Sequence, residues 1–325
     1  MKQFRSIATT LAFTVALLAS SPAAHAAYPD RPVHIIVGFS PGGPTDVVAR
    51  AFAAYAAQAT GQSFIVENKP GANTILAAEA VAKAPADGYT LLFGATNHTM
   101  IPALYQNRVK FDALKSFAPI CNVAVSPTVL VVGPSMPVKT MGEFLAKLKA
   151  EPGKHTYATP GTGSSGHFAT EQFLRLTGTS MNHIPYKGAA QAISDLMGGQ
   201  VDSSLATLGS VLPQVQSGKL TALAVAAQRT IPQLPQVPTF DQAGVHGYSG
   251  DAWYGVLAPA GISTQVQQTL EQLATGYAER PETAKSLDLL GMQPRHTCGN
   301  AFRDQMANEI SSYTTLANDL GLKAE

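Results

Sequence analysis

Two glycine-rich turns carry the residues best suited to holding an anion. The first runs from Phe39 to Asp46 and reads FSPGGPTD, and the second runs from Thr159 to His167 and reads TPGTGSSGH. Each turn stands between a predicted buried strand and a predicted helix. Glycine lets the backbone approach a ligand closely, and a helix N-terminus offers unpaired N–H groups and partial positive charge. Each turn therefore predicts an anion site that needs no lysine or arginine.

Ordinary helix capping also explains either turn when it is taken alone. Pro44 suits the first turn of a helix, and Ser164 or Ser165 suits an N-cap. Two such turns in equivalent places of two α/β units favour binding, because ligands of open α/β sheets sit at the carboxyl ends of the strands. If the two turns face each other across a cleft, an anion can be held from both sides.

Two enzyme signatures are incomplete in the second turn. Gly161, Gly163 and Gly166 match the dinucleotide fingerprint, but the acidic residue expected about 20 positions later is missing. Asp195 stands 29 residues beyond Gly166, inside a helix pattern. Neither serine of this turn fits the G-x-S-x-G nucleophile elbow. A catalytic triad is defined by geometry rather than by sequence position, so a hydrolase stays open as an alternative.

The remaining polar residues give weaker signals. The chain has 8 histidines, and their positions show no metal-ligand spacing. The sequence therefore predicts no metal site, no cofactor and no catalytic residue. Lys187 stands between a short strand and a helix, where it could place a cation at the cleft. Lone lysines are mostly solvated, and Lys187 is interpreted that way.

The elements that must position the two turns alternate between apolar strands and amphipathic helices. Strands are predicted at 33–39, 64–67 and 89–93, with helices at 47–59 and 74–83. This order argues for a parallel sheet with helices on both faces. A second series comprises strands at 129–132, 156–158, 201–205 and 220–226, and helices at 141–150, 165–176, 190–197 and 209–217. The last third adds a strand at 253–257 and helices at 264–277, 281–290 and 302–316.

A chain of this length usually divides into two domains. The final strand and its long helices fit a return to the first domain after the second is complete. Domain 1 is therefore predicted to comprise residues 28–125 plus 250–325, and domain 2 residues 126–249. The two crossings near residues 125 and 250 would then form a hinge.

The N-terminal segment has the order of a secretory signal peptide. Lys2 and Arg5 precede an apolar run of 13 residues from Ile7 to Ala19, and Ala24-His25-Ala26 supplies a small-x-small cleavage site. The run is shorter than the roughly 20 residues that a membrane-spanning helix needs. Residues 1–26 are thus predicted to be removed, and the mature protein is expected in the periplasm.

Charge and cysteine content exclude several other classes. The formal net charge is +1, and lysine and arginine do not cluster, so no nucleic-acid partner is expected. Cys121 and Cys298 are too few for a disulfide scaffold and too far apart for a zinc knuckle. They could form one disulfide in an oxidising compartment, or they could be two unpaired structural thiols.

On these residues the chain resembles the Bug family of periplasmic solute-binding proteins, the extracytoplasmic receptors of tripartite tricarboxylate transporters. The resemblance covers residues 28–325. Its blocks, in order, are YPxRP from Tyr28, FxPGGxxD from Phe39, VENKPGA from Val66, PxDGYTL from Pro85, PYKG from Pro185, GGQVD from Gly198 and WYG from Trp253.

The resemblance implies an α/β fold of the periplasmic binding protein (flytrap) type, with two domains that are each a Rossmann-like sheet flanked by helices. It implies a monomer, not an enzyme, that captures a small carboxylate between its domains. That ligand would be a di- or tricarboxylate or an aromatic acid, handed to the membrane components of a tripartite tricarboxylate transporter. The ligand itself is not named by the resemblance, and the two cysteines are not part of the family pattern.

The resemblance also implies that backbone N–H groups and small hydroxyls hold the ligand carboxylate, with ordered waters at the first turn. In domain 1 the implied ligand contacts are Phe39, Pro41, Gly42, Gly43, Asp46, Thr96 and Asn97. In domain 2 they are Thr159, Gly161, Thr162, Gly163, Ser164, Ser165 and Asp202, the last expected near the cleft.

Two other functions remain open on the sequence. A periplasmic hydrolase of carboxylate esters would use the same cleft for chemistry, and turnover of an ester would reveal it. A sensory module would present the bound ligand to a membrane receptor, and the sequence does not distinguish this role from transport.

Overall fold

The computed structural model describes residues 28–105, 108–227, 229–248 and 250–322. The predicted signal peptide, residues 1–26, lies outside the described residues. The chain divides after Asp30 into two units, and all elements discussed below belong to the unit that starts at Arg31.

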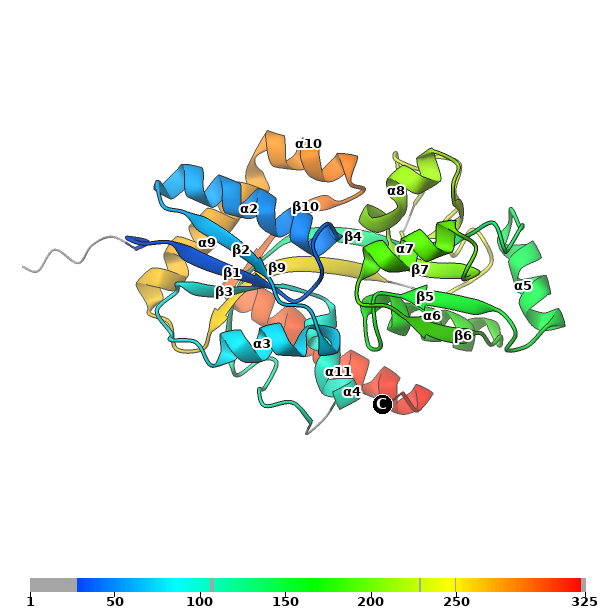
Figure 1. Ribbon diagram of the computed structural model, residues 1–325, viewed down its shortest axis with the longest axis horizontal. Coiled ribbons are helices and arrows are strands. Elements are labelled where there is room, and N and C mark those ends of the chain that lie inside the picture. The colour runs from blue at the N-terminus through cyan, green and yellow to red at the C-terminus, as the bar shows by residue number, and fades with distance from the viewer. Residues whose placement is uncertain (1–27, 106–107, 228, 249, 323–325) are drawn as a thin grey trace, which may run out of the picture. The chain divides into compact units, whose positions relative to one another are not determined.

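Most predicted strands and helices are present with ends shifted by a few residues, but the strand predicted at 129–132 begins much earlier, at Phe117 (Figure 1). The strands are β1 (Val33–Val37), β2 (Phe64–Asn68), β3 (Thr90–Ala95), β4 (Phe117–Val132), β5 (Thr156–Thr159), β6 (Asn182–Pro185), β7 (Ser203–Thr207), β8 (Thr221–Val225), β9 (Asp251–Pro259) and β10 (Gln293–Cys298). The helices are α2 (Pro44–Thr60), α3 (Ile75–Ala82), α4 (Asn97–Tyr105), α5 (Met141–Ala150), α6 (Ser165–Thr177), α7 (Ala189–Met197), α8 (Leu208–Gln216), α9 (Thr264–Glu279), α10 (Pro281–Leu289) and α11 (Gly299–Leu320), with the 3₁₀ turn η1 (Ala72–Thr74) before α3.

Strand β4 is shared by two groups of strands. Its residues 117–127 pair with β9, and its residues 128–132 pair with β7. We call β1, β2, β3, β9 and β10 with η1 and helices α2–α4 and α9–α11 lobe 1, and β5–β8 with helices α5–α8 lobe 2. Pairs β1–β2, β1–β3 and β5–β6 are parallel, whereas β9 runs antiparallel to both β3 and β4. The sequence analysis predicts a parallel sheet, and this is wrong, because the sheet contains both parallel and antiparallel pairs.

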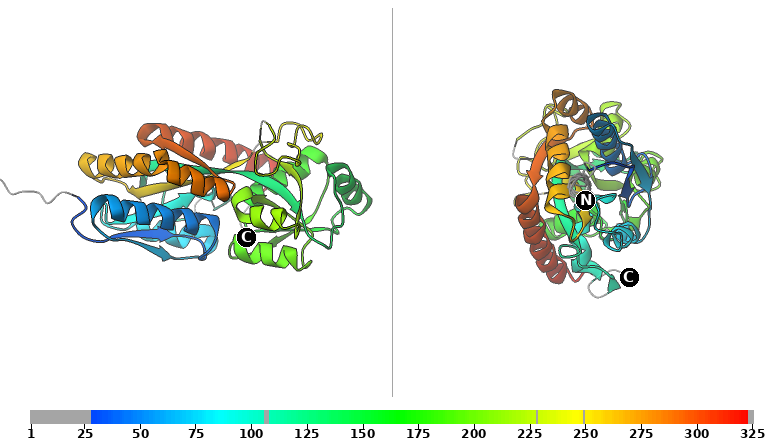
Figure 2. Two further views of the ribbon diagram at one scale, coloured as in Figure 1. Left: turned by 90° about the horizontal axis from the view of Figure 1, so that it is seen from above. Right: turned by 90° about the vertical axis from the view of Figure 1, so that its left-hand side faces the viewer.

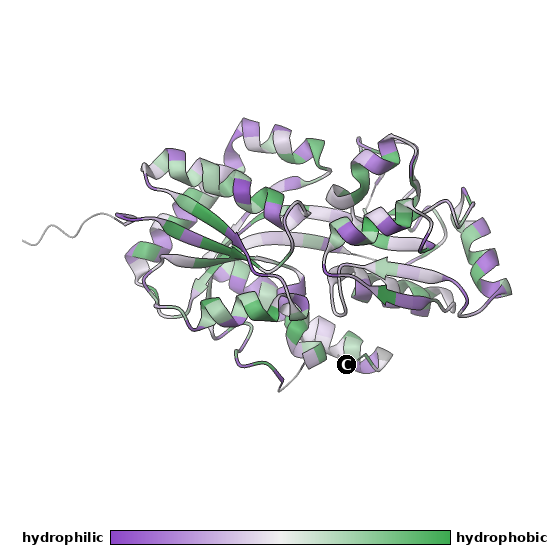
Figure 3. Ribbon diagram, viewed as in Figure 1, coloured by the Kyte–Doolittle hydropathy of each residue, from purple (hydrophilic) through white to green (hydrophobic). Residues whose placement is uncertain are grey.

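Each lobe buries apolar side chains on both faces of its strands. In lobe 1, Phe52 of α2 packs against Phe93 and against Tyr277 of α9, while α3 and α11 cover the other face (Figures 1 and 2). In lobe 2, α5 and α6 share one apolar cluster, and α7 and α8 share another. Figure 3 shows mainly hydrophobic residues in β1 and the first part of β2, whereas the helices beside them mix hydrophobic and hydrophilic residues. Two groups of strands that share β4, each flanked by helices, confirm the predicted fold class.

The lobes are joined by β4, which continues from one into the other, and by the segment that leads into β9 (Figures 1 and 2). These lie close to the predicted crossings near residues 125 and 250. Because β4 runs without a break through the first of them, no loop marks a domain boundary there. The boundaries given above stay a prediction.

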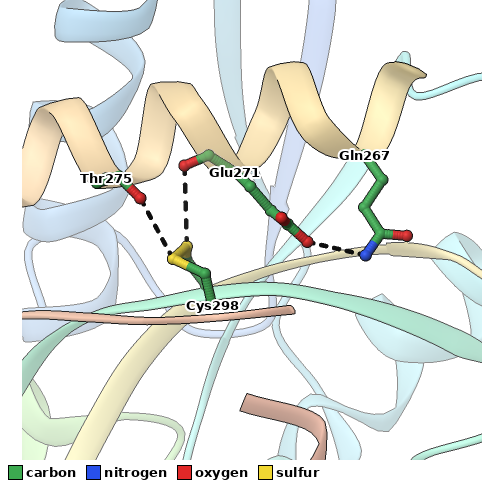
Figure 4. The surroundings of a disulfide bond; sticks show 5 residues. Gln267, Glu271, Thr275 and Cys298 are labelled. Atoms are coloured by element: carbon green, nitrogen blue, oxygen red, sulfur yellow. Dashed lines mark hydrogen bonds between the residues drawn. A yellow bond between two sulfur atoms is a disulfide. The ribbon is translucent and has the colours of Figure 1, made fainter. Parts of the chain in front are cut away.

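Cys121 on β4 and Cys298 at the end of β10 form a disulfide, which answers the question that the sequence left open. Helix α9 covers the bond (Figure 4). The Cys121 sulfur lies 4.0 Å from the carbonyl oxygen of Glu271, and the Cys298 sulfur lies 3.4 Å from the hydroxyl of Thr275. The disulfide thus fixes β10 to the central strand beneath α9.

Removing this disulfide is expected to lower the free energy of unfolding by about 2–5 kcal/mol. The two cysteines are 177 residues apart, so the bond restricts a long loop of the unfolded chain. Denaturant unfolding of a Cys121→Ala/Cys298→Ala variant checks this. The variant should not respond to a reductant, whereas the parent protein should become less stable. Equal stability of the two proteins would contradict the expectation.

Within the described residues, no helix is both long enough and apolar enough to cross a membrane.

Candidate functional site

A cavity of about 180 Å³ lies between the two lobes, at the carboxyl ends of β1, β5, β6 and β7. A single water needs only about 15 Å³, so the cavity has room for a ligand of several atoms. Lobe 1 lines it with Phe39, Ser40, Gly43, Pro44, Thr45, Ala95, Asn97, Ala252 and Tyr254. Lobe 2 lines it with Pro160, Ser164, Ser165, Gly166, Lys187, Gly188, Ala189, Ala190, Gln191, Ala192, Ile193, Ser204, Leu205, Ala206, Thr207 and Ser210.

The first glycine-rich turn brings the N-terminus of α2 to this cavity. Gly43 is the N-cap and Pro44 the first helical residue, and no side chain caps the helix. The first N–H groups of a helix have no partner within it. Pro44 has no N–H group, so those of Thr45 and Asp46 are the first that α2 offers.

Asp46 supports this turn from behind instead of lining the cavity. Its side chain is 4% exposed and accepts hydrogen bonds from the Gly42 N–H, Arg50 and Asn68. Burial raises the pKa of the Asp46 carboxyl, but the hydrogen bonds from Arg50, Gly42 and Asn68 outweigh it, and the net pKa is lowered. An ionised carboxylate therefore already occupies the first turn of α2.

The second glycine-rich turn brings the N-terminus of α6 to the cavity from lobe 2. Ser164 is the N-cap, and its hydroxyl accepts from the N–H of His167. The Gly163 N–H donates to Nδ1 of His167 at 3.0 Å, so it is not directed at the cavity. Among the described residues, no acceptor pairs with the N–H groups of Ser165 and Gly166. These two groups are the donors that α6 offers to a ligand.

Three stacked rings support the second turn. The ring of His183 lies 4.9 Å from that of Tyr157 and 4.1 Å from that of His167, measured between centroids. The hydroxyl of Thr159 lies 2.7 Å from Nε2 of His183. Burial lowers the pKa of His183 to about 4, and burial together with the neighbouring His183 lowers that of His167 to about 3. Both rings are therefore neutral at physiological pH.

Three further helix N-termini, those of α4, α7 and α8, reach the cavity, and the sequence analysis did not identify them as anion sites. Helix α4 begins at Asn97, which lines the cavity. Helix α7 follows Gly188, which has φ 149° and provides no side-chain cap, and α8 follows Thr207, which also makes no capping bond. The signal for α7 was present, because Gly188 stands between a short strand and a helix as in the two turns. Helix α8 lacks any glycine pair before it, and only its strand–helix order could have indicated it.

Five of the residues implied by the family resemblance line the cavity, namely Phe39, Gly43, Asn97, Ser164 and Ser165. The others do not line it, namely Pro41, Gly42, Asp46, Thr96, Thr159, Gly161, Thr162, Gly163 and Asp202, although most of them directly precede or follow a lining residue in the sequence. Thr96, for example, accepts a hydrogen bond from the backbone N–H of Trp253 and so links β3 to β9.

Asp202 requires a correction, because it does not lie near the cleft. It precedes β7, and β7 runs parallel to β5. The cavity is at the carboxyl ends of these strands, whereas the Asp202 carboxylate accepts from the N–H and the hydroxyl of Thr156, the first residue of β5. Asp202 therefore ties the two strands together at the end away from the cavity.

The lobes touch on either side of the cavity. The hydroxyl of Ser40 donates to the carbonyl oxygen of Lys187 at 3.1 Å, so the first turn contacts the loop before α7. Gly163 lies against Leu104 and Asn73 of lobe 1. Phe168 of α6 is buried with residues of α4 and α11. The Lys187 side chain is exposed, as interpreted from the sequence, although it borders the cavity.

Comparison with known proteins agrees with this geometry. The family described as the tripartite tricarboxylate transporter family receptor matches residues 48–322. Protein BugT of Bordetella pertussis is 31% identical over 324 residues, which are 99% of each chain.

Two solved structures carry carboxylate ligands. A Rhodopseudomonas palustris protein solved with adipate is 30% identical with a TM-score of 0.88, over 91% of this chain and 100% of that one. The protein MatC from the same species, solved with bound malate, is 29% identical with a TM-score of 0.84, over 89% of this chain and 99% of that one.

Proposed function

Because this chain belongs to the receptor family of tripartite tricarboxylate transporters, we propose that it captures a small carboxylate in the cavity between its lobes. The observation that carries the proposal is the convergence of five helix N-termini, those of α2, α4, α6, α7 and α8, on that cavity. No carboxylate side chain lines it among the described residues. Unpaired N–H groups and the helix dipoles favour an anion there.

The similar proteins support a carboxylate as that anion, since one was solved with adipate and another with malate. In this proposal the lobes close on the ligand by a hinge motion about β4 and the segment before β9. The residues that bind are those of the two glycine-rich turns that line the cavity, together with the starts of α4, α7 and α8. The protein acts as a monomer.

The place of action is the periplasm, reached through the signal peptide predicted at residues 1–26. The loaded receptor then delivers its carboxylate to the membrane components of a tripartite tricarboxylate transporter. The family consists of solute-binding receptors and not of enzymes. The site agrees with that, because the Ser164 hydroxyl is engaged as an N-cap and accepts from a backbone N–H instead of contacting a histidine ring.

A thermal-shift screen of mono-, di- and tricarboxylates tests the proposal, with the corresponding neutral amides as controls. A ligand at 100 times its dissociation constant should add about 2.7 kcal/mol to the free energy of unfolding. Chromatography of the recovered ligand shows whether it is unchanged. Saturable binding of an unchanged acid supports a receptor. Turnover of a carboxylate ester, or equal binding of acid and amide, contradicts it.

A further inference from the structure

We propose that this protein has a second binding site, which takes a small organic cation with primary ammonium groups, in a groove on the other side of β9 from the carboxylate cavity. The groove has a volume of about 1060 Å³. It is bordered in lobe 1 by β4, β9, β10 and α11, and in lobe 2 by α6, Tyr248 and the segment after β8. This site goes beyond the proposed carboxylate function, and its test does not depend on that function.

Strand β9 separates the groove from the cavity. Successive side chains of a strand point to opposite faces of the sheet. Ala252 and Tyr254 line the cavity, whereas Asp251 and Trp253 border the groove. The groove is therefore not an extension of the cavity, and the two can be occupied at the same time.

The groove carries more negative than positive charge. Asp241, Asp251 and Glu309 border it, and Arg295 is the one lysine or arginine on its wall within the described part of the chain. Asp251 is an exposed residue, but partial burial of its carboxyl raises the pKa, and the charge of Arg295 lowers it by less. In the described ranges, neither Asp251 nor Glu309 forms an ion pair. Two carboxylates are thus left without a cation.

A row of hydrogen bonds along the groove ends on an acceptor that has no donor. Glu309 Oε1 accepts from the side-chain nitrogen of Gln305, and Gln305 Oε1 accepts from the side-chain nitrogen of Asn122 at 3.4 Å. An ionised carboxylate only accepts, so Glu309 fixes the orientation of both amides. The side-chain oxygen of Asn122 is therefore the free atom of the row. Asn122 borders the groove and is 1% exposed, and this oxygen has no partner in the part of the chain that the structure describes.

These unsatisfied groups call for a ligand that donates hydrogen bonds and carries positive charge. The second oxygen of Glu309 already accepts from the indole N–H of Trp253 and from the Thr99 hydroxyl. The Asp251 carboxylate and the Asn122 oxygen are left, and an ammonium group donates to both types of acceptor. The groove is also bordered by side chains that both donate and accept, and so fit a ligand of either charge, namely Gln172, Thr297, Asn308, Ser312 and Tyr313.

The wall of the groove favours an organic cation over a metal ion. A metal ion needs several ligand atoms around one point, and no three His, Cys, Asp or Glu side chains among the described residues lie close enough together to hold one. The rings of Tyr248, Trp253 and Tyr313 border the groove, as do the apolar side chains of Val125 and Leu316. Aromatic rings attract ammonium groups, and apolar side chains bury a methylene chain. An alkyl diammonium ion combines these features.

The single tryptophan of the sequence makes occupancy of the groove observable. Trp253 borders the groove and is bonded to Glu309, so its fluorescence should respond to a bound cation. Titration of the full mature chain with cadaverine, an alkyl diammonium ion, should give a saturable fluorescence change and saturable heat in a calorimeter. Pentylamine, with one ammonium group, should bind more weakly. Absence of saturable cadaverine binding, or an equal response to magnesium chloride at the same ionic strength, would overturn the proposal.

The Asp251→Asn variant tests the place of binding. It removes the charge but keeps the shape of the side chain, and it should weaken cadaverine binding by roughly fivefold or more. Asp304→Asn is the matched control, because Asp304 is an exposed carboxylate on α11 that does not border the groove. Its affinity for cadaverine should equal that of the parent. Parental affinity in Asp251→Asn, or equal weakening in both variants, would show that the cation does not bind in this groove.

Discussion

Gly163→Val is expected to weaken ligand binding by about 10- to 100-fold. A Cβ atom at position 163 would lie 2.1 Å from a methyl carbon of Leu104 and 2.9 Å from the side-chain nitrogen of Asn73. Both of these residues belong to lobe 1, so the added side chain stands between the lobes. Overpacking of this kind costs about 1–3 kcal/mol, and the cost is removed only when the lobes move apart.

A second effect of the same substitution acts on stability and must be separated from the first. Gly163 has φ +76°, which costs a β-branched residue about 1–2 kcal/mol. Gly178 has φ +62° with no atom within 4 Å of an added Cβ. Gly178→Val should therefore lower stability by a similar amount without changing affinity. Calorimetric titration of both variants gives the comparison. Parental affinity in Gly163→Val would contradict the closed contact between the lobes.

The stability of the protein is expected to fall steeply between pH 6.5 and pH 5. Burial lowers the pKa of His98 to about 4, and that of His167 is lowered to about 3 by burial and by the adjacent His183. An unfolded histidine has a pKa near 6.5. Above that pH both states are neutral and stability is complete. Below it the unfolded chain takes up protons that the folded chain excludes, and stability declines until the folded pKa values are reached.

His98 and His167 should each contribute a loss of about 2 kcal/mol by pH 5. His183, whose pKa burial also lowers to about 4, adds to the loss in the same pH window. The lowered pKa of Asp46 acts in a separate window, because its contribution is lost only as the pH falls below about 4. Urea unfolding at several pH values measures the slope of the free energy of unfolding against pH, which gives the number of protons taken up on unfolding. His167→Gln should reduce it by about one proton, and His246→Gln, at a side chain that is 79% exposed, should not change it. A flat profile would contradict the buried, neutral state of the rings.

The strands and helices that could be predicted from the sequence are those with a clear pattern in their own residues. Strands such as β1 and helices such as α6 have an apolar pattern and a local start signal, so their positions were predictable. Helix α4 contains Pro102, and β10 reads QPRHTC with no apolar alternation. Strand β10 is stabilised by its pairing with β4. The formation of β10 depends on this pairing with a strand far away in the sequence, which a local sequence pattern does not reveal.

The candidate site was predictable to the same extent. Both glycine-rich turns meet at one cavity as expected, and the resemblance to the receptor family is confirmed. Two expectations about the site were wrong, and both concerned the direction in which a strand or an N–H group points. The resemblance implied that Asp202 lies near the cleft, but Asp202 precedes β7 and so stands at the end of that strand away from the cavity. The N–H of Gly163 was expected to hold the ligand, but it donates to His167, four residues further along the chain.

The disulfide determines which fragments of the chain stay covalently linked after proteolysis. Cys121 and Cys298 enclose a ring of backbone that contains all of lobe 2. A protease that cuts one peptide bond anywhere in this ring leaves both pieces attached to each other through sulfur. A cut before Cys121 or after Cys298 releases a fragment instead. After one such cut, lobe 2 stays connected to lobe 1 through the uncut backbone on one side and through the disulfide on the other. A single cut in an exposed loop of lobe 2 therefore does not detach it.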